Sequence, residues 1–139
     1  MNKVTYTKAL GILGIGIWVG TIFLRETSAV NMQVIGFLLG IAPNIGAVWG
    51  VATIFEEMYS VLLKKKYTLK VAVAALIGIF ILGLGSEIVH DLFLNSPFDI
   101  YDMISTIVAS VIYILPIWIK NRNNNVNSKI SVNHEEEIL

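Results

Sequence analysis

The sequence contains no cysteine, which excludes disulfides, iron–sulfur clusters and thiolate metal sites. It also has few charges: Asp, Glu, Lys and Arg make up 14 % of the 139 residues, whereas 55 % of the residues are hydrophobic. Soluble domains carry about 25 % charged residues, and the mean hydropathy of this chain is +0.73. Ten basic residues balance ten acidic ones, so the charge predicts no nucleic-acid partner. We therefore expect the apolar residues to contact a lipid bilayer.

Four long segments carry few or no charges, which predicts an all-α bundle of four transmembrane helices. The expected spans are residues 9–24, 34–55, 71–86 and 100–119. The second span has twenty-two residues without a charge, enough for a hydrocarbon core of about 30 Å at about 1.5 Å per residue. The first could also be a signal peptide, but no convincing small-residue cleavage site follows it, so we interpret it as a retained helix.

The domain organisation predicted from this pattern is a transmembrane domain over residues 1–119 and a tail over residues 120–139. The tail is rich in asparagine and mixed in charge. It has too little apolar material to form a core, and we expect it to be flexible and cytoplasmic.

The distribution of basic residues predicts the orientation of the bundle. The N-terminus, the second loop and the tail together hold nine of the ten Lys and Arg residues, and Arg25 is alone in the first loop. Short loops rich in Lys and Arg stay on the cytoplasmic side. We therefore expect a multi-pass protein of the cell membrane with both termini in the cytoplasm and residues 85–102 facing outward.

The outward stretch GSEIVHDLFLNSPFDIYD, residues 85–102, holds four of the ten acidic residues together with His90. Counting along each helix from its inner basic residue places Arg25, Glu87 and Asp102 seventeen or eighteen residues away. That distance is roughly 26 Å in a straight helix, which is close to the outer edge of the hydrocarbon. Charges at this depth are costly unless they are paired, hydrated or turned into the bundle.

Three interpretations of this cluster remain open. In the first, Arg25 pairs with Glu87 to hold two helices together and Asp99 caps the last helix. In the second, Arg25, Glu87, Asp102 and His90 form a ligand-binding site. In the third, the Glu87-x-x-His90 spacing is half of a metal-binding motif, although no second copy follows. We predict no bound metal and no cofactor.

The same stretch extended to Ser110, GSEIVHDLFLNSPFDIYDMISTIVAS, resembles the C-terminal signature of VanZ-like membrane proteins. Glu87 and Asp102 match that signature, and His90, Ser96 and Thr106 stand where the family usually has Gln, Arg and Asn. The resemblance covers about twenty-five of the 139 residues. It implies a small bacterial membrane protein of the cell envelope, in a family with some members linked to resistance to the glycopeptide teicoplanin.

Pro43 and Asn44 lie near the middle of the second predicted span. Proline removes one helical hydrogen bond, and an amide in apolar surroundings needs a partner. We interpret the pair as a kink with an interhelical hydrogen bond. A polar step in a transport path is the alternative, and it makes Asn44 a candidate intramembrane polar residue.

Three G-x-x-x-G patterns begin at Gly16, Gly36 and Gly46. Small residues at this spacing allow two helices to approach closely. We expect them to pack helices within the bundle, with a homo-oligomer as the alternative.

The function predicted from these features is binding of an envelope-related or amphiphilic ligand, of lipid-linked or glycopeptide type, at the outer face. A small transporter or channel subunit is one alternative, although no acidic residue lies deep in the expected spans. A holin-like or immunity-type structural protein is another. An enzyme would use Glu87 with Asp102, or His90, as acid and base. No nucleophile or phosphate-loop motif supports that reading, so we assign no catalytic residues.

Overall fold

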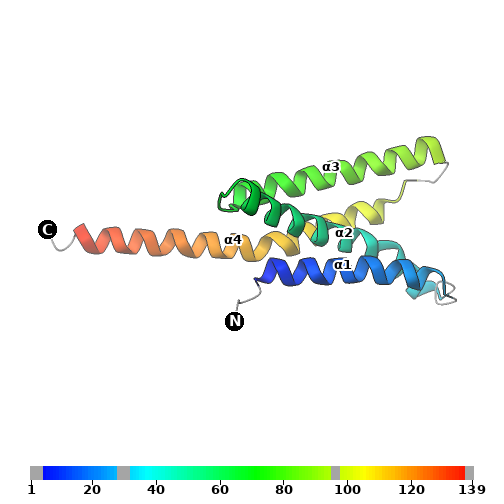
Figure 1. The fold of residues 1–139 in the computed structure, drawn as a ribbon, viewed down its shortest axis with the longest axis horizontal. Helices are drawn as coiled ribbons and strands as arrows, with labels where there is room; N and C mark the ends of the chain where they lie inside the picture. The colour runs from blue at the N-terminus through cyan, green and yellow to red at the C-terminus, as the bar shows by residue number, and fades with distance from the viewer. Residues whose placement is uncertain (1–4, 28–31, 95–97, 137–139) are drawn as a thin grey trace.

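The computed structural model describes residues 5–27, 32–94 and 98–136, with side chains described through Phe93 in the third helix and Asn123 in the fourth. These residues form four helices, α1 (Tyr6–Arg25), α2 (Gln33–Leu62), α3 (Leu69–Leu94) and α4 (Ile100–Glu136). Each contains a segment long and apolar enough to cross a membrane. The predicted all-α fold with four apolar helices is confirmed, and the chain has the architecture of a multi-pass membrane protein (Figure 1).

All four helices are longer than the predicted spans, because a helix does not stop where the hydrocarbon does. α2 continues seven residues past the predicted end at residue 55, and α3 runs on to Leu94. The extra turns of α2 carry Glu56 and Glu57, and those of α3 carry Glu87 and Asp91.

Residues 120–136 of the predicted tail are helical in the structure, and the flexibility of the tail stays a prediction. α4 has no break at residue 120 and continues to Glu136, and Figure 1 shows it projecting well beyond the bundle. The physical reason is that residues 117–136 contain neither glycine nor proline, so no residue after Pro116 interrupts the helical hydrogen bonding.

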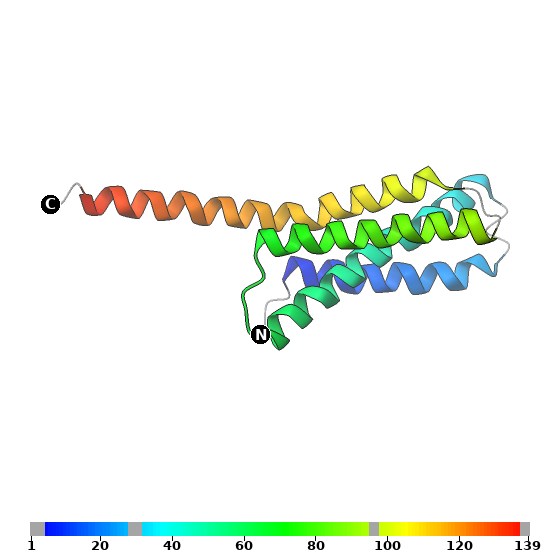
Figure 2. The same ribbon diagram turned by 90° about the horizontal axis from the view of Figure 1, so that it is seen from above.

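The helices begin and end at two opposite ends of the bundle (Figure 2), and charged residues lie near these helix ends in the sequence. α1 and α3 begin where α2 ends, and this lysine end carries Lys8, Lys64–Lys66 and Lys70. The opposite, acidic end carries Glu87, Asp99 and Asp102. The two ends correspond to the inner and outer faces expected from the sequence; which side of a membrane each one faces stays a prediction.

Glycine brings α1 and α2 together. A Cβ atom added to Gly46 would lie 2.6 Å from the carbonyl oxygen of Gly14, and one added to Gly14 would lie 2.8 Å from that of Gly46. Neither site has room for a larger residue. By contrast, a Cβ atom at Gly16, Gly20 or Gly40 would meet nothing within 4 Å. The motif beginning at Gly46 therefore packs the bundle, whereas the face of Gly16 and Gly20 is open.

The core lies where α2 meets α4. Ala52, Ala109 and Tyr113 are fully buried there, and the indole Nε1 of Trp49 donates a 3.0 Å hydrogen bond to the carbonyl oxygen of Ala109. α3 packs more loosely, because only 11 % of its membrane-spanning segment is buried, against 28 % in each of the other helices. Both views show α3 at the edge of the bundle (Figures 1 and 2).

Candidate functional site

The site at the acidic end begins with a break in the hydrogen bonding of α2. Pro43 has no backbone N–H, so the carbonyl oxygen of Leu39, four residues earlier, loses its helical donor. The guanidinium of Arg25 replaces that donor: Nε and Nη2 lie 3.2 and 2.9 Å from the oxygen of Leu39. Nη2 also lies 3.5 Å from the oxygen of Gly40. The end of α1 is thus tied to the weakened turn of α2.

Asn44 follows Pro43 directly, and its side chain acts on the carboxyl group of Asp102 in α4. Both residues are partly buried. The polar residue of the second span therefore lies near the acidic end, whereas the predicted interhelical hydrogen bond stays a prediction. Phe37 and Tyr101 reinforce this contact with an edge-to-face packing at a centroid distance of 5.4 Å.

Two more carboxylates complete the site. Asp99 caps α4, since its Oδ1 accepts a 2.8 Å hydrogen bond from the backbone N–H of Tyr101. The backbone N–H of Asp99 in turn lies 3.4 Å from Oε2 of Glu87 on α3. Glu87 and Asp99 both repel the Asp102 carboxylate electrostatically, whereas Arg25 attracts it.

Negative charge exceeds positive charge at this end of the bundle. Three carboxylates face one guanidinium, and the hydrogen bonds found for Arg25 go to backbone carbonyl oxygens. No salt bridge joins Arg25 to an acid within the part of the chain that the structure describes. The arrangement can therefore accommodate an additional cationic group.

The structure brings some of the predicted site residues together and leaves His90 apart from them. Arg25 and Glu87 both act electrostatically on Asp102, so the structure brings these three together, and Asn44 joins them. His90 is exposed, and no hydrogen bond or ion pair connects it to this site among the described residues. Any role of these residues in binding a ligand stays a prediction.

Sequence reasoning missed a second polar site toward the lysine end. The hydroxyl group of Tyr113, a fully buried residue, donates a 2.8 Å hydrogen bond to Oε2 of Glu56. Tyr113 lies within the segment of α4 that could cross a membrane. The second predicted span ends at residue 55, which places Glu56 outside it. The signal was its helical spacing, because Trp49, Thr53 and Glu56 recur on the face that α2 turns toward the core.

The surroundings of Glu56 contain further polar groups. Thr53 donates a 2.9 Å hydrogen bond to the carbonyl oxygen of Thr7, and the exposed pair Lys8 and Glu57 forms a 2.9 Å salt bridge, which adds little stability. The Tyr67 hydroxyl group is buried and has no hydrogen-bond partner among the residues that the structure describes. Burial, and to a lesser extent the charge of Glu56, raises the pKa of Tyr67 to about 12.

The described residues contain no group of three or more His, Cys, Asp or Glu side chains that could hold a metal ion. Comparison with known proteins finds no matching family, no matching curated sequence and no matching solved structure. The resemblance to VanZ-like proteins therefore rests on the residues of the acidic end alone. The chain is therefore a four-helix membrane protein with one polar site at the acidic end and a second toward the lysine end.

Proposed function

We propose that this chain is a small VanZ-like protein of the bacterial cell envelope, and that it binds an amphiphilic ligand carrying a cationic group at the acidic end. The observation that supports the proposal most strongly is the set of hydrogen bonds that Arg25 makes. Its guanidinium is engaged by the carbonyl oxygens of α2. Among the described residues, Glu87, Asp99 and Asp102 therefore have no salt-bridge partner.

The position of the acids favours an amphiphile over a soluble cation. Asp102 and Glu87 are partly buried, at helix ends that lead directly into apolar segments. A ligand with an ammonium or guanidinium group could pair with these carboxylates while its apolar part stays in the bilayer. Charge-assisted hydrogen bonds of this kind are about twice as strong as neutral ones.

Survival of a susceptible bacterium exposed to teicoplanin tests the proposal in cells. Expression of the chain should increase survival, and Glu87→Gln and Asp102→Asn should each abolish the increase at unchanged protein abundance. Glu57→Gln changes an exposed acid at the other end of the bundle and should behave as the unaltered chain. No gain in survival on expression, or equal survival with all three variants, would reject the proposal.

A proton-coupled transporter is the second candidate, and Glu56 is the observation that favours it. The sequence appeared to offer no acid deep in a span, but Glu56 bonds Tyr113 inside one. A pH-sensitive dye enclosed in liposomes would report proton flux. If the chain transports protons, Glu56→Gln should abolish the proton flux and Glu57→Gln should preserve it. Equal proton leakage with and without the chain would exclude a transporter.

A further inference from the structure

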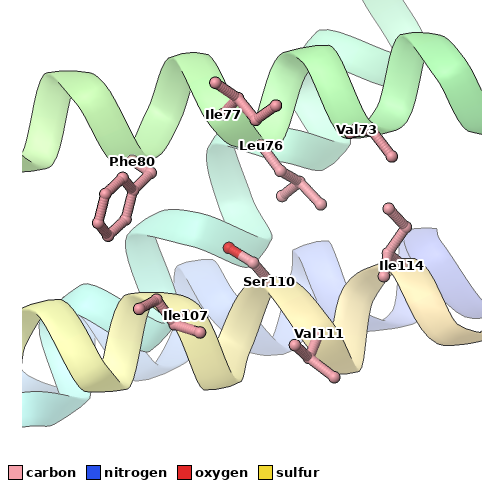
Figure 3. A pocket seen from close by; sticks show the side chains of 8 residues that line it. All are labelled: Val73, Leu76, Ile77, Phe80, Ile107, Ser110, Val111 and Ile114. Carbon is pink, nitrogen blue, oxygen red and sulfur yellow. The ribbon is translucent and has the colours of Figure 1, made fainter.

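A groove lies between the loosely packed helix α3 and α4, and none of the carboxylates of the acidic end line it. Its central part is an apolar cavity of about 250 Å³, with Val73 and Phe80 on α3 and Ile114 on α4 among the side chains that point into it (Figure 3). Ser110 is the one polar residue in the lining, and its hydroxyl group donates a 2.8 Å hydrogen bond to the carbonyl oxygen of Thr106 in its own helix. The cavity therefore suits an apolar chain.

A second cavity, of about 150 Å³, lies at the lysine end. Its polar lining includes Lys66, Thr68, Lys120 and Asn121, and no acidic residue lines it. Neither lysine forms a salt bridge within the described part of the chain. This cavity thus presents two positive charges and neutral hydrogen-bonding groups, a combination that fits a phosphate group.

The two cavities occupy successive turns of the same groove. On α3, Leu69 lines the cationic cavity and Val73, four residues later, lines the apolar one. On α4, Ile117 lines the cationic cavity and Ile114, three residues earlier, lines the apolar one. Residues three or four apart share a helix face. From Leu69 to Phe80 the groove is roughly 16 Å long at about 1.5 Å per residue, or about half of a 30 Å hydrocarbon core.

From this juxtaposition we propose that the α3/α4 groove is a binding site for one anionic phospholipid of the leaflet at the lysine end. Lys66 and Lys120 hold the phosphate, and one acyl chain lies against α3 in the apolar cavity. The positive charge at the polar end of the groove favours an anionic headgroup. The length of the groove matches one leaflet of a bilayer. The bound acyl chain also covers part of the poorly buried helix α3.

Native mass spectrometry of the purified full chain in neutral detergent tests this site, with dioleoyl phosphatidylglycerol and dioleoyl phosphatidylcholine as probes. The unaltered chain should bind phosphatidylglycerol more tightly than phosphatidylcholine. The double variant Lys66→Gln, Lys120→Gln should bind phosphatidylglycerol roughly thirtyfold more weakly, because each lysine near an anionic headgroup contributes about fivefold. The matched control Lys64→Gln, Lys65→Gln removes two lysines that line neither cavity and should lose less than about threefold.

A second pair of variants tests the acyl chain. Ile77→Trp narrows the apolar cavity, whereas Ile81→Trp adds the same bulk at an exposed residue outside it. Only the first should weaken phosphatidylglycerol binding. Equal losses from the two lysine pairs, equal affinity for the two lipids, or equal effects of the two tryptophans would each overturn the proposal.

Discussion

Arg25 donates two hydrogen bonds, of 2.9 and 3.2 Å, to the carbonyl oxygen of Leu39. That oxygen lies four residues before Pro43, which cannot supply the helical donor. The arginine at the end of α1 therefore satisfies the break that the proline creates in α2. It also keeps one positive charge beside the carboxylates of the acidic end.

Arg25→Gln should destabilise the chain by about 1–3 kcal/mol, the cost of leaving a buried acceptor without its donor. Pro43→Ala should restore the backbone N–H and with it the hydrogen bond to Leu39. The loss from Arg25→Gln should then shrink to less than about 1 kcal/mol in the Pro43→Ala background. Equilibrium unfolding of the four variants in detergent measures this coupling, and additive effects would show that the two residues act independently.

The sequence was sufficient for the number of helices and for the gathering of Arg25, Glu87 and Asp102 at one end of the bundle, because charge and hydrophobicity along the chain determine both. Their common depth in a membrane stays a prediction. It was not sufficient for the bond from Arg25 to Leu39, which depends on how α1 and α2 pack. Glu56 was missed for a related reason. Its charge appeared to end the span, whereas the Tyr113 hydroxyl group that compensates it belongs to another helix.

Gly46→Ala should disrupt the packing of α1 on α2. The added methyl group would meet the carbonyl oxygen of Gly14 at 2.6 Å, and overpacking of this kind costs about 1–3 kcal/mol. Gly16→Ala is the matched control, because a Cβ atom there meets nothing within 4 Å. Thermal unfolding in detergent should show a lower midpoint for Gly46→Ala alone. A lower midpoint only for Gly16→Ala would place the essential contact on the open face, as in a homodimer.

Tyr67 should make stability depend on pH in the alkaline range. Its pKa is about 12 in the folded chain against an ordinary value of 10.0, so the unfolded chain loses this proton first as the pH rises. The contribution is complete below about pH 10 and declines between about 10 and 12. Tyr67→Phe should lose less stability than the unaltered chain between pH 9 and 11.5, as measured by thermal midpoints.

At pH 7 the same variant should be equally stable or more stable, by up to about 1 kcal/mol, because it no longer buries an unpaired hydroxyl group. A marked loss of stability at pH 7 would mean that the hydroxyl group has a partner.

The orientation can be tested because the chain has no native cysteine. Asp91→Cys and Lys65→Cys place single thiols at exposed positions near opposite ends of the bundle. A membrane-impermeant maleimide added to intact cells should label the first and not the second. Labelling of Lys65→Cys alone would invert the proposed topology and place the acidic end in the cytoplasm.

Binding of a simple cationic amphiphile tests the central proposal most directly. The measurement is equilibrium binding of radiolabelled dodecylamine at pH 7 to the chain in phosphatidylcholine nanodiscs, with empty nanodiscs subtracted. The unaltered chain and Glu57→Gln should bind alike, and Asp102→Asn should bind at least about tenfold more weakly, since a hydrogen bond to a charged group contributes about 1.5–3 kcal/mol. Binding that Asp102→Asn leaves unchanged, or no binding above that of empty nanodiscs, would contradict the proposal.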